Sequence, residues 1–231
     1  MELTPELSVI SVILIGFVLG LQHAIEADHL AAVSTIVSEK KGLFAASIVG
    51  GLWGFGHTIS LFIVGAVVLI LKVQISETTE ARLEAIVGVM LVILGINAFR
   101  KLFTAKQVHV HSHDHGVREH LHIHAHENEK ADSHHRFSPR SIVIGMVHGL
   151  AGSAALMLLI LPTIPSTTVA LGYILIFGLG SIGGMMIMSM VIGLPLYFTA
   201  NRFELLNKGI RVFAGLFSLV LGASIIYEKL G

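Results

Sequence analysis

Long uninterrupted runs of hydrophobic residues divide this chain of 231 residues into six blocks. A transmembrane helix needs about 20 consecutive apolar residues, and each block reaches that length. The sequence therefore predicts an all-α polytopic membrane protein with six transmembrane helices. The blocks cover residues 8–37, 43–71, 83–103, 140–162, 168–194 and 208–228.

Composition favours the same interpretation, because 54% of the residues are hydrophobic and only 13% are charged. Soluble domains carry about 25% charged residues, which a large soluble core would need at its surface. Residues 1–7 are acidic rather than basic, and no small-residue cleavage site follows them. We therefore expect the first block to stay in the membrane, and the chain to be a multi-pass protein of the cell (plasma) membrane.

The distribution of positive charge predicts an orientation. With six spans, twelve of the 15 Lys and Arg residues fall on one side of the membrane, and three fall on the other. Cytoplasmic loops are the ones enriched in Lys and Arg. The sequence thus predicts that both termini lie outside and that the long loop 104–138 is cytoplasmic.

The two halves of the chain resemble each other weakly. Residues 20–23 match 145–148, 125 positions later, and residues 51–56 match 178–183, 127 positions later, which pairs His57 with Gly184. Because each half holds three spans, an odd number, the second half would cross the membrane in the opposite sense, as in many secondary transporters. We expect two inverted three-helix repeats on either side of a loop, with segments 1–103, 104–138 and 139–231.

A cluster of polar residues interrupts the first block, in the sequence His23-Ala-Ile-Glu-Ala-Asp-His29. An acidic residue near the centre of a membrane helix costs roughly 2.5–3.5 kcal/mol to insert, so such residues are functional candidates. Imidazole and carboxylate ligands together suit a divalent transition metal. The cluster therefore predicts an intramembrane metal site that includes His23, Glu26, Asp28 and His29.

The geometry of an undistorted helix does not bring all four groups together. His23, Glu26 and His29 share one stripe, whereas Asp28 points about 140° away from His23. The block would also be about 45 Å long as a single helix, which exceeds the bilayer core. We therefore expect a break in the helix near Gly20, or ligands from another helix.

Two further histidines lie inside apolar blocks. His57 follows four glycines, and His148 lies in the fourth block beside further glycines. We interpret both as additional ligands or gate residues, the alternative being histidines that bond to neighbouring helices. The chain has no cysteine, so any metal site must use imidazole, carboxylate, carbonyl or water.

The loop 104–138 holds ten of the 14 histidines. Histidine-rich tracts are typical of metal binding, and alternation in an extended chain places the members of a run on one side. We expect this loop to be disordered without metal and to chelate ions weakly at several places. Its two alternating runs are His109, His111, His113 and His115, then His120, His122, His124 and His126.

At these motifs the chain resembles the nickel/cobalt transporter superfamily, and especially its short six-helix branch of urease-accessory-type nickel permeases. The His-x4-Asp-His signature of that family matches His23, Asp28 and His29, and its Gly-His motif matches Gly56-His57. The longer members have Arg and Asp where this chain has Gln22 and Glu26. The resemblance implies transport of Ni2+ or Co2+ as cargo, with no resident cofactor, and a functional link to urease or other nickel enzymes.

The expected function is therefore transport of Ni2+, and of Co2+ by similar ligand chemistry, most simply uptake through a midplane site. Exporters of the same superfamily also have six spans and a histidine-rich loop, so efflux is an alternative. The expected partners are the metal ion and the bilayer, with no nucleic acid. No Gly-x4-Gly-Lys-Ser/Thr motif is present, so the membrane potential, a proton gradient or a partner ATPase must drive the flux.

Alternatives from other classes are a membrane-embedded zinc hydrolase and a metal sensor that uses the loop. The spacing of His23, Glu26 and His29 differs from the His-Glu-x2-His pattern of zinc hydrolases, in which the two histidines are four residues apart. The sequence therefore favours a transporter over an enzyme.

Overall fold

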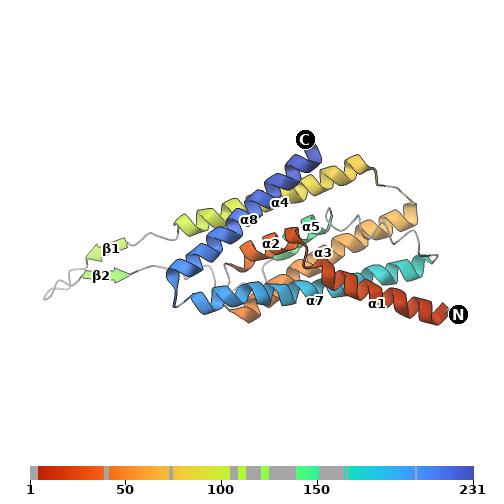
Figure 1. The fold of residues 1–231 in the computed structure, drawn as a ribbon, viewed down its shortest axis with the longest axis horizontal. Coiled ribbons are helices and arrows are strands. Elements are labelled where there is room, and N and C mark those ends of the chain that lie inside the picture. Colours follow the sequence, from red (N-terminus) through yellow and green to blue (C-terminus); the bar gives the residue numbers. More distant parts are fainter. Residues whose placement is uncertain are drawn as a thin grey trace.

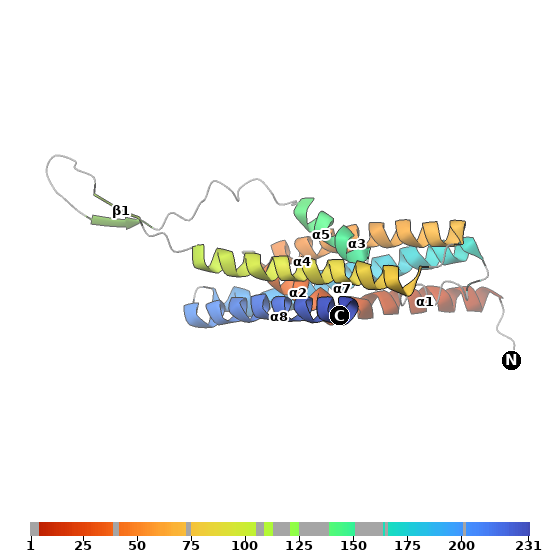
Figure 2. The same cartoon turned by 90° about the horizontal axis from the view of Figure 1, so that it is seen from above.

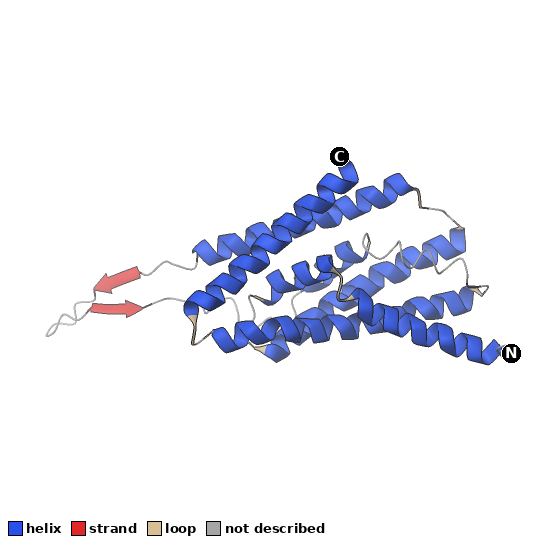
Figure 3. Ribbon diagram, viewed as in Figure 1, coloured by secondary structure: helices blue, strands red, loops and turns tan. Residues whose placement is uncertain are grey.

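The computed structural model describes residues 5–38, 42–72, 75–104, 109–112, 121–124, 139–150, 164, 166–200 and 202–231. Helices account for most of this part of the chain (Figure 3). They are α1 (Pro5–His23), α2 (Ala27–Val37), α3 (Leu43–Leu71), α4 (Glu77–Thr104), α5 (Pro139–Gly149), α7 (Thr167–Thr199) and α8 (Glu204–Leu230).

Four helices, α3, α4, α7 and α8, are long and apolar enough to cross a membrane, and α1 with α2 makes up to five spans within the described residues. Large apolar side chains such as Leu179 and Phe213 are exposed on their outer faces, as helices surrounded by lipid require. The chain is therefore a helical membrane protein. Of the span predicted at 140–162, α5 covers the first part, and residues 151–162 lie outside the described residues.

The first predicted span is broken, although not where the sequence indicated. Helix α1 continues through Gly20 to His23, and α2 starts at Ala27 with its axis bent by 57°. Glu26, between them, has extended backbone angles of φ −61° and ψ 150°. The predicted break near Gly20 is thus misplaced by a few residues, because Gly20 serves a helix contact instead.

Glycines permit unusually close contact between two pairs of helices. On α1 and α7, Gly20 and Gly180 each face a main-chain carbonyl of the partner helix. On α3 and α5, Gly56 and Gly145 do the same. A Cβ atom at any of these positions would overlap that carbonyl, so only glycine allows the observed distance. These contacts hold α1 against the middle of α7, and α5 against the middle of α3.

The remaining long helices, α4 and α8, form a pair along one side of the molecule (Figure 1). The Ser218 hydroxyl on α8 donates a hydrogen bond of 2.8 Å to the Leu91 carbonyl on α4. The short helix α2 contacts this pair on one side and α3 and α7 on the other. At the break before α2, His23 and Ala24 are therefore buried, whereas Ile25 is 54% exposed.

Part of the histidine-rich loop forms a small antiparallel hairpin of β1 (His109–Ser112) and β2 (Leu121–His124). His109 is opposite His124, and His111 is opposite His122. The strands extend beyond the helices, at the end of the molecule away from the N-terminus (Figure 2). These eight residues thus differ from the predicted disorder, because their alternating pattern also suits a strand.

Candidate metal centre

The four intramembrane histidines, each predicted as a candidate ligand, gather in one buried cluster. Each has at most 1% of its surface exposed. They come from the end of α1 (His23), the start of α2 (His29), the middle of α3 (His57) and the end of α5 (His148). The ring of His29 lies centrally, with centroid distances of 4.3 Å to His23 and 4.2 Å to His148.

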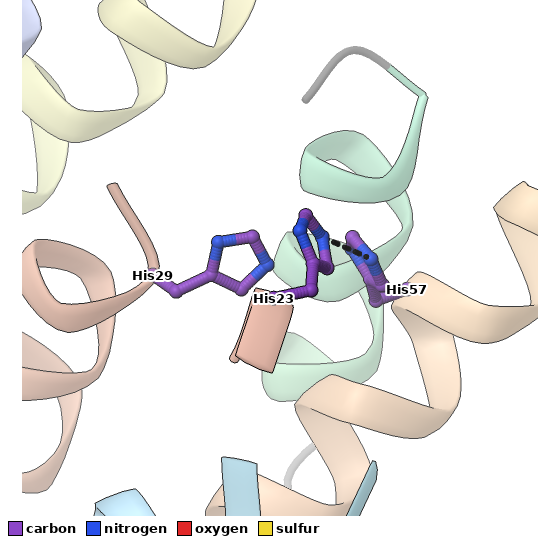
Figure 4. Close-up of side chains that lie close together, drawn as sticks. All are labelled: His23, His29 and His57. Atoms are coloured by element: carbon purple, nitrogen blue, oxygen red, sulfur yellow. Dashed lines mark hydrogen bonds between the residues drawn. The ribbon is translucent and has the colours of Figure 1, made fainter. Parts of the chain in front are cut away.

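One set of three residues that could hold a metal ion consists of His23, His29 and His57, and each is fully buried. Their potential ligand atoms all lie within 4.8 Å of one another. The Nε2 atoms of His23 and His57 are 3.3 Å apart, and the two rings face each other in Figure 4. We call this set the imidazole group.

A second set consists of Asp28, His29 and His148, whose potential ligand atoms are also within 4.8 Å of one another. The two carboxylate oxygens of Asp28 have different partners: Oδ1 is 3.0 Å from Nδ1 of His29, and Oδ2 is 3.0 Å from Nε2 of His148. Oδ1 also accepts a hydrogen bond from the main-chain N–H of His29 at 2.9 Å. We call this set the carboxylate group.

Glu26, the remaining predicted ligand of the cluster, belongs to neither set. Its Oε1 atom is 2.8 Å from Nδ1 of His23, and its side chain is 38% exposed. A carboxylate hydrogen-bonded to one nitrogen of an imidazole fixes the orientation of the ring and leaves the other nitrogen free for a metal. Glu26 is therefore placed to orient His23, whose Nε2 atom faces His57.

Aromatic side chains enclose the cluster. The ring of Trp53 lies 5.2 Å from that of His29 and 5.3 Å from that of His148, and Phe177 lies 5.5 Å from His23. The sequence prediction missed both residues. Trp53 could have been found, because it precedes His57 by four residues and so lies on the same face of α3.

Two nitrogen atoms of the cluster have no hydrogen-bond partner although they are buried, namely Nε2 of His29 and Nδ1 of His148. A buried polar atom without a partner costs about 1–3 kcal/mol. Imidazole nitrogens with one carboxylate form a donor set that first-row transition metals such as Ni2+ prefer, whereas Mg2+ and Ca2+ prefer oxygen ligands. The cluster is thus chemically suited to bind a transition-metal cation.

The loop histidines are distributed differently. His109, His111, His122 and His124 lie on the two strands. The other predicted members of the two runs, His113, His115, His120 and His126, lie outside the described residues.

Comparison with known proteins agrees with this chemistry. Residues 9–225 match the NicO family model, described as high-affinity nickel-transport protein. The chain is 39% identical to the urease accessory protein UreH of Bacillus sp. (strain TB-90), over 96% of this chain and 93% of that protein. It is also 24% identical to the Arabidopsis thaliana chloroplast protein FOR GROWTH AND FERTILITY 2, over 93% of this chain and 55% of that protein.

No solved structure matches the chain significantly. The family match covers nearly the whole chain, and the UreH relative aligns over almost its full length. The chain therefore belongs to the NicO family of nickel-transport proteins, and it is a membrane transport protein rather than an enzyme.

Proposed function

We propose that this protein takes up Ni2+ across the cell membrane through the buried cluster of His23, Asp28, His29, His57 and His148, with Glu26 orienting His23. The observation that carries the proposal is that four separate helices bring imidazole and carboxylate groups together in the protein interior. A soft, nitrogen-rich site selects transition metals over the abundant hard cations. Co2+ has similar ligand preferences, so we propose it as a second substrate.

We propose that the fold consists of two inverted three-helix repeats, 1–103 and 139–231. The helix contacts support this arrangement, because α1 contacts α7 while α5 contacts α3, and α3 contacts α7 while α4 contacts α8. A two-fold axis that exchanges α1 with α5, α3 with α7 and α4 with α8 produces this pattern. Gly20 faces Phe177 as Gly145 faces Trp53, which favours pairing His57 with Ser181 rather than with Gly184.

We propose that the loop 104–138 is cytoplasmic and that both termini lie outside. The strands β1 and β2 and the N-terminus lie at opposite ends of the molecule, which supports this orientation (Figures 1 and 2). An inside-negative potential drives a divalent cation inward, at about 2.3 kcal/mol per charge per 100 mV, and in this orientation the inward direction is toward the loop. The loop histidines would then bind arriving metal and pass it on. UreH is named as a urease accessory protein, and we propose that this chain likewise supplies nickel to urease or another nickel enzyme.

The test is uptake of radioactive Ni2+ into sealed proteoliposomes of known orientation, driven by an imposed membrane potential. The wild type should show inward flux, His23→Gln should abolish it, and deletion of residues 105–136 should retain most of it. Ser218→Ala, a buried change on the α4–α8 pair, is the matched control and should transport normally.

Flux of Ni2+ only from the loop side, or only against a proton gradient, would identify the protein as an exporter. Unchanged flux in His23→Gln would exclude the cluster as the site. A protein that moves neither Ni2+ nor Co2+ in either direction would contradict the proposed function.

A further inference from the structure

The two sets of potential ligands share one residue. His29 belongs both to the imidazole group and to the carboxylate group, whereas every other member belongs to one only. Its ring is almost equally far from His23 and from His148, at 4.3 Å and 4.2 Å. The two sets of potential ligands therefore overlap at one common member, His29.

The two nitrogen atoms of His29 have different surroundings. Nδ1 lies 3.0 Å from Asp28, in the carboxylate group, whereas Nε2 is buried without a hydrogen-bond partner. In Figure 4 the outer nitrogen of this ring points toward His23, and the nitrogen next to the Cβ bond points away from it. One ring nitrogen of His29 is thus directed toward each group.

A neutral imidazole has a lone pair on one nitrogen and a proton on the other. His29 can therefore complete only one group at a time. With the proton on Nδ1, it donates to Asp28 and offers Nε2 to the imidazole group. With the proton on Nε2, it offers Nδ1 to the carboxylate group. Occupation of one group excludes occupation of the other.

Each group also borders a different cavity. His23 lines a cavity of about 320 Å³ between α1 and α7, together with Gln22 and Tyr173. Asp28 lines another of about 320 Å³ between α2, α4 and α8, together with Glu84. Glu26 lines both. An ion in either cavity would thus meet one group first.

We propose that the imidazole group and the carboxylate group are two successive stations for one Ni2+ ion, and that the ion passes between them by changing nitrogens on His29. The inference rests on the proposed function and refines its site. The ring is neutral at both stations: its proton is on Nδ1, toward Asp28, while the ion is bound to Nε2, and on Nε2 while the ion is bound to Nδ1. Because both stations include the His29 ring, the ion moves only from one side of this ring to the other, which limits its exposure as an uncoordinated cation in the membrane interior.

The test compares two variants that each remove one station. His148→Gln leaves the imidazole group complete, and His57→Gln leaves the carboxylate group complete. Both are made in a full-length chain whose ten loop histidines are replaced by glutamine, so that binding reports on the membrane cluster alone. Ni2+ binding is measured by equilibrium dialysis, the ligands by X-ray absorption, and flux in proteoliposomes.

Each variant should still bind one Ni2+ per chain, with an affinity within about a hundredfold of that of the background chain. X-ray absorption should find imidazole ligands alone in His148→Gln and an added carboxylate in His57→Gln. Neither should transport Ni2+, because the ion has no second station. His29→Gln should lose binding at both stations, and Ser218→Ala should behave as the background does.

Complete loss of binding in either single variant would overturn the proposal, since it would mean one composite site. Normal flux in either variant would overturn it too. If a glutamine variant does not fold, Asp28→Asn removes the carboxylate at nearly constant size and permits the same comparison. A background chain that binds Ni2+ but never transports it would count against the proposed function, whereas the two stations are judged by the binding and spectra of the variants.

Discussion

Asp28 connects two histidines of the cluster that come from different helices. One of its carboxylate oxygens contacts the neighbouring residue His29, and the other contacts His148 of α5. A lone carboxylate at this depth would be costly, so both oxygens need partners. The same pairing keeps imidazole and carboxylate close enough to share a cation. Proton binding to these ligands competes with metal binding, since Ni2+ requires neutral imidazole and ionised carboxylate.

At the scale of single residues we predict that acid weakens metal binding. Lowering the pH should reduce Ni2+ affinity, because imidazole and carboxylate ligands must release any bound proton before the ion binds. Equilibrium dialysis of the chain without loop histidines measures this directly. An affinity that stays the same at every pH down to the one at which the protein unfolds would contradict a site of imidazole and carboxylate ligands.

Helix packing determines whether these side chains can meet at all. His148 reaches the cluster because α5 lies tightly against α3, and His23 does so because α1 lies tightly against α7. Both contacts depend on glycines that face main-chain carbonyls. The helix contacts and the metal site are therefore coupled, and a methyl group at one of these glycines should disturb the site.

At the scale of elements we predict different effects for two glycines of the same helix, α7. Gly180→Ala would place a Cβ atom against the Phe17 carbonyl and should destabilise the protein by about 1–3 kcal/mol, as overpacking does. Gly172→Ala meets nothing within 4 Å and should leave stability unchanged or raise it by up to about 1 kcal/mol, because alanine favours a helix more than glycine does. Thermal unfolding in detergent, followed by size exclusion, compares the two. Equal stability would show that the α1–α7 contact does not require glycine.

The two ends of the molecule differ, because the histidine-rich strands lie at one end and the N-terminus lies at the other (Figure 1). The α3–α4 connection should lie on the side of the termini, and the α7–α8 connection on the side of the loop. The chain contains no cysteine, so single cysteines can report each connection without background labelling.

At the scale of the whole molecule we predict that Ser76→Cys reacts with a membrane-impermeant maleimide in intact cells. Both Ser76 and Phe203 are exposed, yet Phe203→Cys should react only after the cells are made permeable. The cysteine-free parent is the control. The opposite labelling pattern would reverse the proposed orientation.

The sequence by itself determined the helical membrane class, because a bilayer requires long apolar runs and satisfied backbone groups. The predicted span 43–71 coincides with α3 (Leu43–Leu71) for this reason, and the spans at 83–103, 168–194 and 208–228 differ from α4, α7 and α8 only at their ends. The first predicted span is instead broken after His23. The sequence also identified the four buried histidines and Asp28, since polar groups are conspicuous in an apolar run.

Only the tertiary structure decided how these residues are distributed between the two sets of potential ligands. His148 and Asp28 are 120 positions apart, so their distance of 3.0 Å depends on where α5 crosses the interior, which no local pattern encodes. The break after His23 leaves Glu26 beside Nδ1 of His23, at 2.8 Å, rather than in either set of potential ligands. His29 holds its central place because three other helices present their histidines around it, and the positions of those helices follow from glycine contacts distant in sequence.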